Sequence, residues 1–274
     1  MPEGDSIFRA GRTLNRALAG KPIVRFESVL PALTRVHEDH PITGRLMEKV
    51  SSVGKHLLMQ FSGDLVLRTH MKMNGSWHIY RPGERWRKPR RDMRVVVATA
   101  DFEAVGFDIP VAEFLRPADL KRHDELRRLG PDLLADDVDI AEGVTRLKTR
   151  GTTEIGDALL NQRAVAGIGN VYKSEVLFAC GVNPFERVAA LSDDQLTALI
   201  ETAVRYLRAN VSDGLAAMTT YTGYRRTTRR GNPSERLWVY ARGRLPCRKC
   251  GTPISVRAQG PDARLTYWCP KCQA

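Results

Sequence analysis

The pattern of apolar and polar positions changes twice along the chain, and the first pattern is helical. Residues 5–18 repeat apolar side chains at helical spacing, with Asp5 or Ser6 as the expected cap and Gly20 and Pro22 as the end. The expected apolar face consists of Ile7, Ala10, Leu14, Ala17 and Leu18. The start of the chain therefore predicts an amphipathic helix.

From Ile23 to about Leu115 the pattern becomes one of short runs rich in Val, Ile, Leu and Phe. The clearest runs are residues 55–61, 65–71, 77–80 and 94–100. Turn dipeptides separate them, namely Gly63-Asp64, Asn74-Gly75 and Pro82-Gly83. This segment predicts an antiparallel β domain, closed as a sandwich or a barrel.

Beyond Arg116-Pro117 the periodicity is helical again, and the most clearly marked helix follows Ser192. Ser192 with Gln195 forms a capping-box pattern, and Leu191 with Leu196 can form a hydrophobic staple. Residues 210–232 are polar and rich in Gly and Arg, which suggests a linker. We expect an α+β multidomain protein with domains at residues 1–118, 119–235 and 236–274.

Charge narrows the class of partner. The 274 residues include 43 Lys and Arg against 31 Asp and Glu, a net charge of +12, which favours a polyanion such as nucleic acid. Two arginine-rich clusters, residues 85–91 and 225–230, fit this interpretation. The chain has neither a long apolar stretch nor a signal-like start. We expect a cytoplasmic monomer, associated with the bacterial nucleoid through DNA.

Four of the five cysteines form two C-x2-C pairs near the end of the chain. Cys247 and Cys250 are separated by 18 residues from Cys269 and Cys272, a spacing typical of a zinc ribbon. Four thiolates complete a closed tetrahedral shell, so the expected cofactor is one structural zinc ion. Cys180 lies in an apolar helical run and is expected to be a small core residue.

The chain starts Met1-Pro2-Glu3-Gly4. If Met1 is removed, Pro2 offers a secondary amine beside the Glu3 carboxylic acid. Attack of such an amine on a sugar aldehyde carbon gives an iminium ion, an electron sink that promotes elimination of a 3′ phosphate. Alone, this tetrapeptide is weak evidence, because proline at position 2 is common.

A glycine-rich turn occurs in the helical region, in Gly167-Ile168-Gly169-Asn170. Asn170 falls where a helix to about Cys180 would start, with Gly181 as its stop. Free amide groups at a helix start, with the Asn side chain, can bind phosphate. A capped helix without a ligand is the alternative.

Four motifs together resemble the formamidopyrimidine-DNA glycosylase and endonuclease VIII family over essentially the whole chain. They are Pro2-Glu3-Gly4, Gly54-Lys55-His56, Gly167-Ile168-Gly169-Asn170 and the cysteine ribbon ending Tyr267-Trp268-Cys269-Pro270-Lys271-Cys272-Gln273. The resemblance implies a base-excision repair enzyme that binds damaged DNA. It also implies a β-sandwich domain, a helical domain with a helix-two-turns-helix, and a zinc finger.

The resemblance also implies roles for individual residues. Pro2 is similar to the nucleophile that attacks C1′ of the damaged nucleotide, ahead of β,δ-elimination, and Glu3 to the proton donor. Lys55, Asn170 and Arg264 are similar to residues that contact phosphates. The alternatives are a helix-start carboxylate for Glu3, solvated charges for Lys55 and Arg264, and a simple cap for Asn170.

A lesion inside a duplex must be flipped out and the gap filled. The resemblance places the fillers at Lys72, Met73 and Asn74, with Met73 as the apolar wedge. A buried strand position is the alternative for Met73.

The chain starts Pro-Glu-Gly and has neither a Pro-Glu-Leu-Pro start nor an Asp-Pro-Arg-Arg-Phe-Gly element. These differences favour the endonuclease VIII branch, which implies oxidised pyrimidines as substrates. Asp5-Ser6 stands where that branch usually has Pro-Glu, whose carboxylate assists sugar ring opening. A non-catalytic protein of the same fold that binds damaged or distorted DNA is the second hypothesis, but it needs neither Pro2 nor Glu3.

Overall fold

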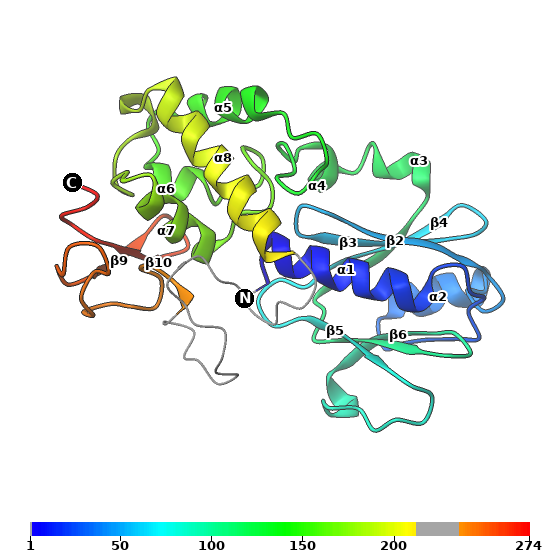
Figure 1. Cartoon of the computed structure of the whole chain (residues 1–274). Helices are drawn as coiled ribbons and strands as arrows, with labels where there is room; N and C mark the ends of the chain where they lie inside the picture. Colours follow the sequence, from blue (N-terminus) through cyan, green and yellow to red (C-terminus); the bar gives the residue numbers. More distant parts are fainter. Residues whose placement is uncertain (1, 212–235) are drawn as a thin grey trace. The chain divides into compact units, whose positions relative to one another are not determined.

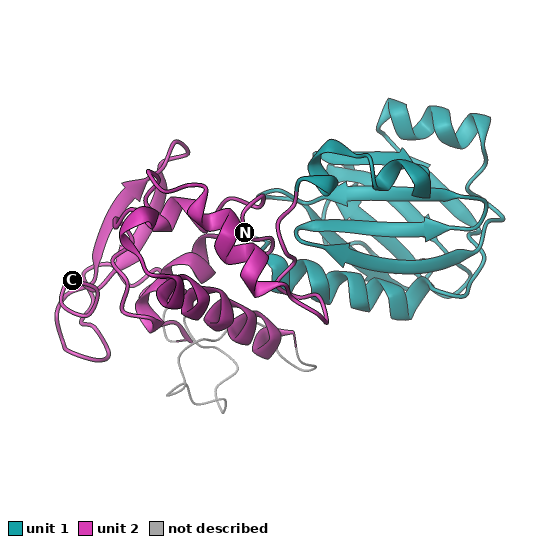
Figure 2. Ribbon diagram, turned by 90° about the horizontal axis from the view of Figure 1, so that it is seen from above, with its two compact units in different colours: residues 1–128 teal, residues 129–274 magenta. Residues whose placement is uncertain are grey.

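The computed structural model describes residues 2–211 and 236–274, and it divides into two compact units, residues 1–128 and 129–274 (Figure 2). Each unit has its own hydrophobic core. The predicted domain limits after residues 118 and 235 stay a prediction. The predicted arginine cluster at residues 225–230 lies outside the described residues.

Unit 1 contains two four-stranded antiparallel sheets (Figure 1). The strands are β1 Arg25–Ser28, β2 Met47–Val53, β3 His56–Phe61, β4 Leu65–His70, β5 Ser76–Tyr80, β6 Met93–Ala98, β7 Glu103–Phe107 and β8 Val111–Leu115. One sheet has the order β2-β3-β4-β8 and the other β1-β6-β7-β5. Apolar side chains from both sheets belong to a single core cluster, for example Leu57 and Leu67 with Val95 and Val97. The predicted β-sandwich is therefore confirmed.

Four α-helices and one 3-10 helix complete the elements described in unit 1. They are α1 Gly4–Leu18, α2 Pro31–Asp39, η1 Arg90–Asp92, α3 Pro117–Leu120 and α4 Asp124–Arg127. The predicted N-terminal helix exists, but the expected cap was wrong, because Glu3 occupies the N-cap position and Ser6 the third helical position. The Glu3 N–H donates to Ser6 Oγ, and Ser6 Oγ donates to the Glu3 carbonyl, both at 2.8 Å. The helix packs against β2 and β3 through buried residues such as Leu14 and Leu18.

The part of unit 2 that the structure describes contains helices and a small hairpin. Its elements are α5 Ile140–Lys148, α6 Ile155–Ala158, α7 Asn170–Ala179, η2 Val188–Ala190, α8 Asp193–Asn210, β9 Ser255–Gln259 and β10 Arg264–Trp268. Two successive turns link α6 to α7, closed by hydrogen bonds from Asn161 N–H to the Ala158 carbonyl and from Ala164 N–H to the Asn161 carbonyl. This is the expected helix-two-turns-helix.

The predicted cap of α8 is confirmed. Ser192 Oγ accepts from the Gln195 N–H at 3.2 Å, and Gln195 Oε1 accepts from the Ser192 N–H at 2.9 Å. The apolar face that follows is buried at Leu196, Leu199 and Leu207. Among the described residues, no helix is both long and apolar enough to cross a lipid bilayer.

Polar side chains form a buried cluster in unit 1 next to the turn that carries Lys55. The Arg68 guanidinium is buried and pairs with Glu113 and Glu125, and its Nη2 donates to His56 Nδ1 at 3.1 Å. The ring centroids of His56 and His70 lie 4.7 Å apart. Because guanidinium and backbone N–H groups can only donate, the Nδ1 atoms of both rings must be unprotonated.

Burial, with the nearby cations, lowers the pKa of both histidines in this cluster. The pKa of His56 falls to about 2, first through burial and then through Arg68. The pKa of His70 falls to about 4, first through burial and then through Lys72. An unfolded chain takes up these protons near pH 6.5, whereas the folded chain does not. The titration of both histidines therefore leaves the free energy of unfolding unchanged above about pH 6.5 and lowers it progressively as the pH falls below that value.

We predict that His56→Asn flattens the acid dependence of unit 1 stability. In the wild type, His56 makes the free energy of unfolding fall by up to about 1.4 kcal/mol per pH unit below about pH 6.5. The Asn side-chain oxygen can still accept from Arg68, but it does not titrate. Urea unfolding at several pH values between about 7 and 5 measures the difference.

The control for this prediction is His40→Asn, an exposed histidine outside the cluster. It removes one imidazole without touching the cluster, so an effect that it shares with His56→Asn does not come from the cluster. An acid dependence of the His56→Asn protein as steep as that of the wild type would contradict the assignment.

Candidate active site, DNA contacts and zinc centre

Pro2 and Glu3 stand at the start of α1. Pro2 is partly exposed, whereas the Glu3 side chain is almost completely buried, with 1% of its surface accessible. The Glu3 carbonyl accepts from the N–H groups of Ser6 and Ile7, so the helix begins directly after this residue. An ordered helix therefore fixes the position of both predicted catalytic residues.

Asp5 and Ser6 differ in what they do. Ser6 binds the backbone of Glu3, so its hydroxyl serves the helix cap. Asp5 is buried, and burial raises the pKa of its carboxyl group, although Arg9 lies 3.2 Å away and opposes the shift. A buried carboxyl group with a raised pKa is thus present three positions after Pro2.

Lys55 lies in the tight turn between β2 and β3, after Gly54, whose φ is +56°. Because α1 packs on these two strands, Pro2, Glu3 and Lys55 are carried by packed elements of the same unit. His56, the first residue of β3, joins Lys55 to the buried Arg68 cluster.

Lys72, Met73 and Asn74 form an exposed loop between β4 and β5. Met73 has 51% of its surface accessible, so the alternative of a buried strand residue was wrong. Lys72 has a φ of +47°, and its N–H donates to His70 Nδ1 at 2.9 Å. A Cβ on Gly75 would lie 2.6 Å from the Met71 carbonyl oxygen, so only glycine fits there. The loop has a defined conformation that presents an apolar side chain.

Asn170 and Arg264 lie close together in unit 2. Asn170 is the first residue of α7, and its Nδ2 donates to the carbonyl of Leu265 at 2.9 Å. Arg264 precedes Leu265 at the start of β10 and has Asp262 at 3.5 Å. The hydrogen bond from the helix therefore fixes the strand that carries Arg264. Lys55, the third predicted phosphate contact, belongs to unit 1.

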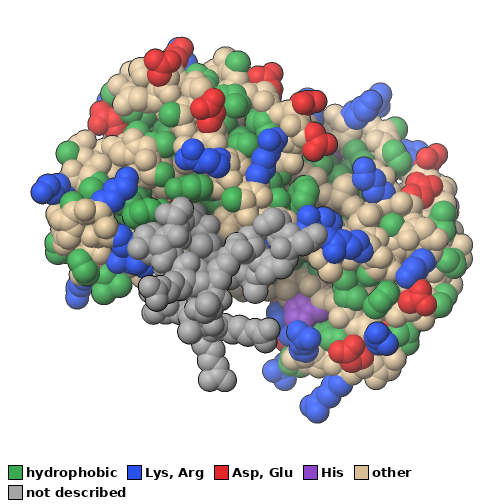
Figure 3. Space-filling model, in the orientation of Figure 1, with side chains coloured by type: hydrophobic (Ala, Val, Ile, Leu, Met, Phe, Trp, Pro, Cys, Tyr) green, Lys and Arg blue, Asp and Glu red, His purple; other side chains and the backbone are tan. Residues whose placement is uncertain are grey.

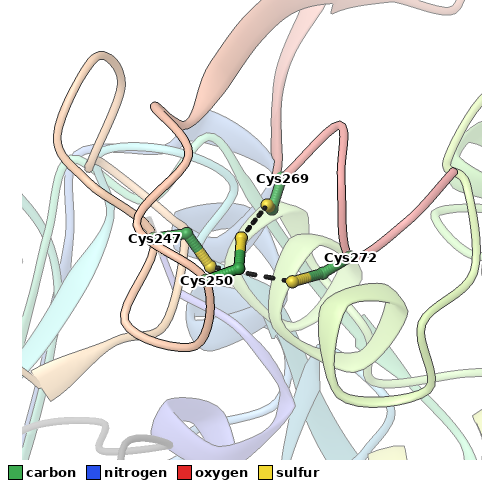
Figure 4. Close-up of side chains that lie close together, drawn as sticks. All are labelled: Cys247, Cys250, Cys269 and Cys272. Atoms are coloured by element: carbon green, nitrogen blue, oxygen red, sulfur yellow. Dashed lines mark hydrogen bonds between the residues drawn. The ribbon is translucent and has the colours of Figure 1, made fainter.

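The four predicted zinc ligands converge on one point (Figure 4). Their Sγ atoms all lie within 4.8 Å of one another, with Cys247–Cys272 at 3.9 Å and Cys250–Cys269 at 3.5 Å. Thiolates bound to one tetrahedral zinc at about 2.3 Å would be about 3.8 Å apart. The geometry and the all-sulfur donor set therefore fit a structural zinc ion.

Two further residues were missed by the sequence analysis. Glu175 of α7 is fully buried and accepts the N–H groups of Trp238, Val239 and Tyr240 at 2.8–2.9 Å. Lys173, also fully buried, donates from Nζ to Thr266 Oγ1 at 2.6 Å. Both residues belong to α7, the helix that starts at the end of the Gly167-Ile168-Gly169-Asn170 turn. Their partners, however, lie about 60 or more residues further along the sequence.

Three family models match the chain in order. They are the formamidopyrimidine-DNA glycosylase N-terminal domain at residues 1–124, the formamidopyrimidine-DNA glycosylase H2TH domain at 129–222, and the zinc finger found in FPG and IleRS at 244–274. The match of the third model, with the sulfur cluster, confirms the expected structural zinc.

Curated relatives are similar along their whole length. The chain is 41% identical to the probable endonuclease 8 2 of Streptomyces coelicolor, covering 100% of this chain and 94% of that protein. It is 37% identical to the DNA-(apurinic or apyrimidinic site) lyase Nei2 of Mycolicibacterium smegmatis, covering 100% and 99%. These names confirm the predicted endonuclease VIII branch.

A solved structure with the same fold is the formamidopyrimidine-DNA glycosylase of Lactococcus lactis bound to DNA containing an abasic site. It aligns with a TM-score of 0.82 at 21% identity over 99% of both chains. A complex of MutM with DNA containing carbocyclic 8-oxo-G aligns with a TM-score of 0.83 at 22% identity over 100% of both.

We predict that Cys250→Ser removes zinc and weakens DNA binding. The zinc content falls from one per chain towards zero, because three thiolates no longer close the shell. Disruption of the knuckle loosens the hairpin that holds Arg264, so the affinity for abasic-site DNA falls at least about tenfold, equivalent to one charge-assisted hydrogen bond. Metal analysis and fluorescence anisotropy measure the two effects.

Cys180→Ser is the matched control, because Cys180 lies outside the sulfur cluster and donates to Thr202 Oγ1 and the Ala198 carbonyl. Its zinc content and DNA affinity should match the wild type. Full zinc content in the Cys250→Ser protein would contradict the ligand assignment.

The fold, the sulfur cluster, three family models and relatives matched over their full length agree with one another. The chain belongs to the formamidopyrimidine-DNA glycosylase family, and it is a DNA glycosylase and lyase of base-excision repair of the endonuclease 8 kind.

Proposed function

We propose that Pro2, exposed by removal of Met1, is the nucleophile of a bifunctional glycosylase that removes oxidised pyrimidines and cleaves abasic sites. The observation that carries the proposal is the burial of the Glu3 carboxyl group directly beside Pro2, at the start of α1. The Glu3 side chain also accepts from the Ser6 N–H in a capping box, but such a bond forms equally well at an exposed helix start and does not require the carboxyl group to leave water. A proton donor, in contrast, benefits from burial, because burial favours the protonated form.

The helix start also suits an amine nucleophile. The first turn of α1 presents partial positive charge, which disfavours the protonated form of a nearby amine. An amine without its proton has the free electron pair needed to attack carbon. The same helix therefore supports both the acid and the nucleophile.

The reaction follows from these two groups. The Pro2 nitrogen bonds to C1′ and the bond from C1′ to the base breaks, while Glu3 supplies the proton that the departing base needs. The C1′–O4′ bond then breaks and opens the sugar ring, and the N–H proton that Pro2 loses as the iminium ion forms goes to O4′. The resulting iminium ion withdraws electrons, so a proton at C2′ is lost and the 3′ phosphate leaves. A second elimination then releases the 5′ phosphate. The raised pKa of the nearby Asp5 carboxyl gives this chain a second group able to hold a proton.

The remaining site residues bind the DNA. Lys55, Asn170 and Arg264 contact phosphates around the flipped nucleotide, and Met73, with Lys72 and Asn74, fills the gap that it leaves. The exposure of Met73 supports the wedge role, because an exposed methionine on an ordered loop can enter a base stack. The proposed substrate class, oxidised pyrimidines, rests on the similarity of the chain to endonuclease 8 proteins. The protein acts as a cytoplasmic monomer.

We predict that a short tag on the N-terminus abolishes covalent capture of abasic DNA by borohydride. A tag replaces the secondary amine of Pro2 with an amide, which cannot form an iminium ion. The trapped complex, resolved by denaturing electrophoresis, should fall at least about a hundredfold, as expected when a nucleophile is removed. Pro2→Gly tests the residue itself.

The same tag on the C-terminus is the matched control and should trap like the wild type, with mass spectrometry verifying the removal of Met1. A second comparison uses Glu3→Gln, which should slow release of a damaged base by about a hundredfold or more but still trap preformed abasic sites. Equal trapping by both tagged proteins would refute the role of Pro2 and favour a binding protein or another nucleophile.

A further inference from the structure

Two connections cross between the sheets of unit 1 next to each other. Residues 71–75 lead from β4 to β5, and residues 108–110 lead from β7 to β8. The strand pairs that flank the connections are His70–Val111 on one sheet and Ser76–Phe107 on the other. The loop of Met73 therefore lies beside residues 108–110.

The two flanks of this loop carry different residues. β4 lies between β3 and β8 in its sheet, and the loop continues from the end of β4. Lys55 directly precedes β3, and Pro110 directly precedes β8. The loop thus has the Lys55 turn on one flank and residues 108–110 on the opposite flank.

A groove of about 700 Å³ occupies the second flank. Its lining residues are Lys72, Met73, Asn74, Lys88, Arg94, Asp108, Ile109 and Pro110. Three cations face one carboxylate, so the groove is positively charged even though Lys88 Nζ lies 2.9 Å from Asp108. Lysine and arginine side chains also gather over the lower part of unit 1 in the space-filling view (Figure 3).

Other interactions hold the cations of the groove in place. Arg94 Nη1 donates to the carbonyls of Arg91 and Met93 at 3.0 Å, which uses part of the donor set of its guanidinium. Lys88 belongs to the connection between β5 and β6, which Trp86 anchors. The Trp86 ring packs edge-on against Phe107 at 5.7 Å between centroids. The groove is therefore built on packed elements.

We propose that this groove binds the phosphodiester backbone of the DNA strand opposite the lesion. The inference rests on the proposed function, in which Pro2 and Lys55 engage the damaged strand and Met73 fills the gap. A wedge inserted between base pairs has one strand on each flank. Because Lys55 stands on the flank of the damaged strand, the cationic groove on the other flank faces the complementary strand.

The test compares a duplex with the same lesion strand alone. The probe is an oligonucleotide with a stable tetrahydrofuran abasic site, and anisotropy measures its affinity over a range of salt concentrations. One variant combines Lys88→Gln with Asp108→Asn, so that no carboxylate is left without its partner, and a second is Arg94→Gln. Arg35→Gln, an exposed arginine of α2 outside the groove, is the matched control.

We expect the three groove substitutions together to weaken duplex binding about tenfold. The slope of the logarithm of the affinity against the logarithm of the salt concentration should become less steep by about one for each phosphate that is no longer neutralised. Affinity for the single strand should not change. Neutral methylphosphonate linkages in the complementary strand should weaken binding by the wild type but not by the combined variant, because both changes remove the same ionic interaction. Arg94→Lys should restore most of the affinity that Arg94→Gln removes.

Equal weakening on duplex and single strand would assign the groove to the damaged strand and overturn the proposal. Unchanged duplex binding by folded variants would overturn it as well. Borohydride trapping of single-stranded abasic DNA by the same variants tests the proposed function separately. Normal trapping with unchanged duplex affinity refutes the groove alone, whereas no trapping by the wild type refutes the chemistry of Pro2.

Discussion

The arrangement of unit 2 depends on burying charged side chains of one short helix. Glu175 and Lys173 of α7 are fully buried, and both bond to residues that lead into or belong to the zinc finger. A buried charge without partners costs several kcal/mol, so α7 and the finger are stable only when they pack together. The same packing brings Asn170 to the strand that carries Arg264. The two predicted phosphate contacts of this unit thus share one structural cause.

Zinc contributes to this packing. The side chains of Cys247 and Cys269 belong to a small core with Phe178 of α7. The four thiolates bring the pair Cys247 and Cys250 together with the pair Cys269 and Cys272, and Ile254, which lies between the pairs, belongs to the same core as Phe178. A finger of about 30 residues cannot bury enough surface to fold alone. Its zinc therefore stabilises the strand that carries Arg264, the predicted phosphate contact, and the packing of the finger against α7.

Local sequence patterns predicted the structural features that depend on residues close together in the chain. The spacing of the cysteines identified the zinc ligands, and Ser192 with Gln195 located the start of α8 within one residue. The cap of α1 was misplaced, since Glu3 is not a usual capping residue and Ser6 acts from inside the helix. The partners of Glu175, Arg68 and His56 could not be predicted, because they come from distant residues and no periodic pattern records them.

Net charge alone would have placed DNA almost anywhere on the chain. Several arginines serve the fold instead: Arg68 is buried with two glutamates, and Arg242 is buried against the carbonyls of Trp238 and Pro246. A cation that binds DNA is expected to differ from these structural arginines in its position, because it lies beside a group that enters the duplex. In the proposal that Met73 enters the duplex, Lys72, Lys88 and Arg94 meet this condition, since they line the same groove as Met73. An apolar wedge between two cationic flanks can hold both strands apart, because each strand gains ionic interactions as its bases unstack.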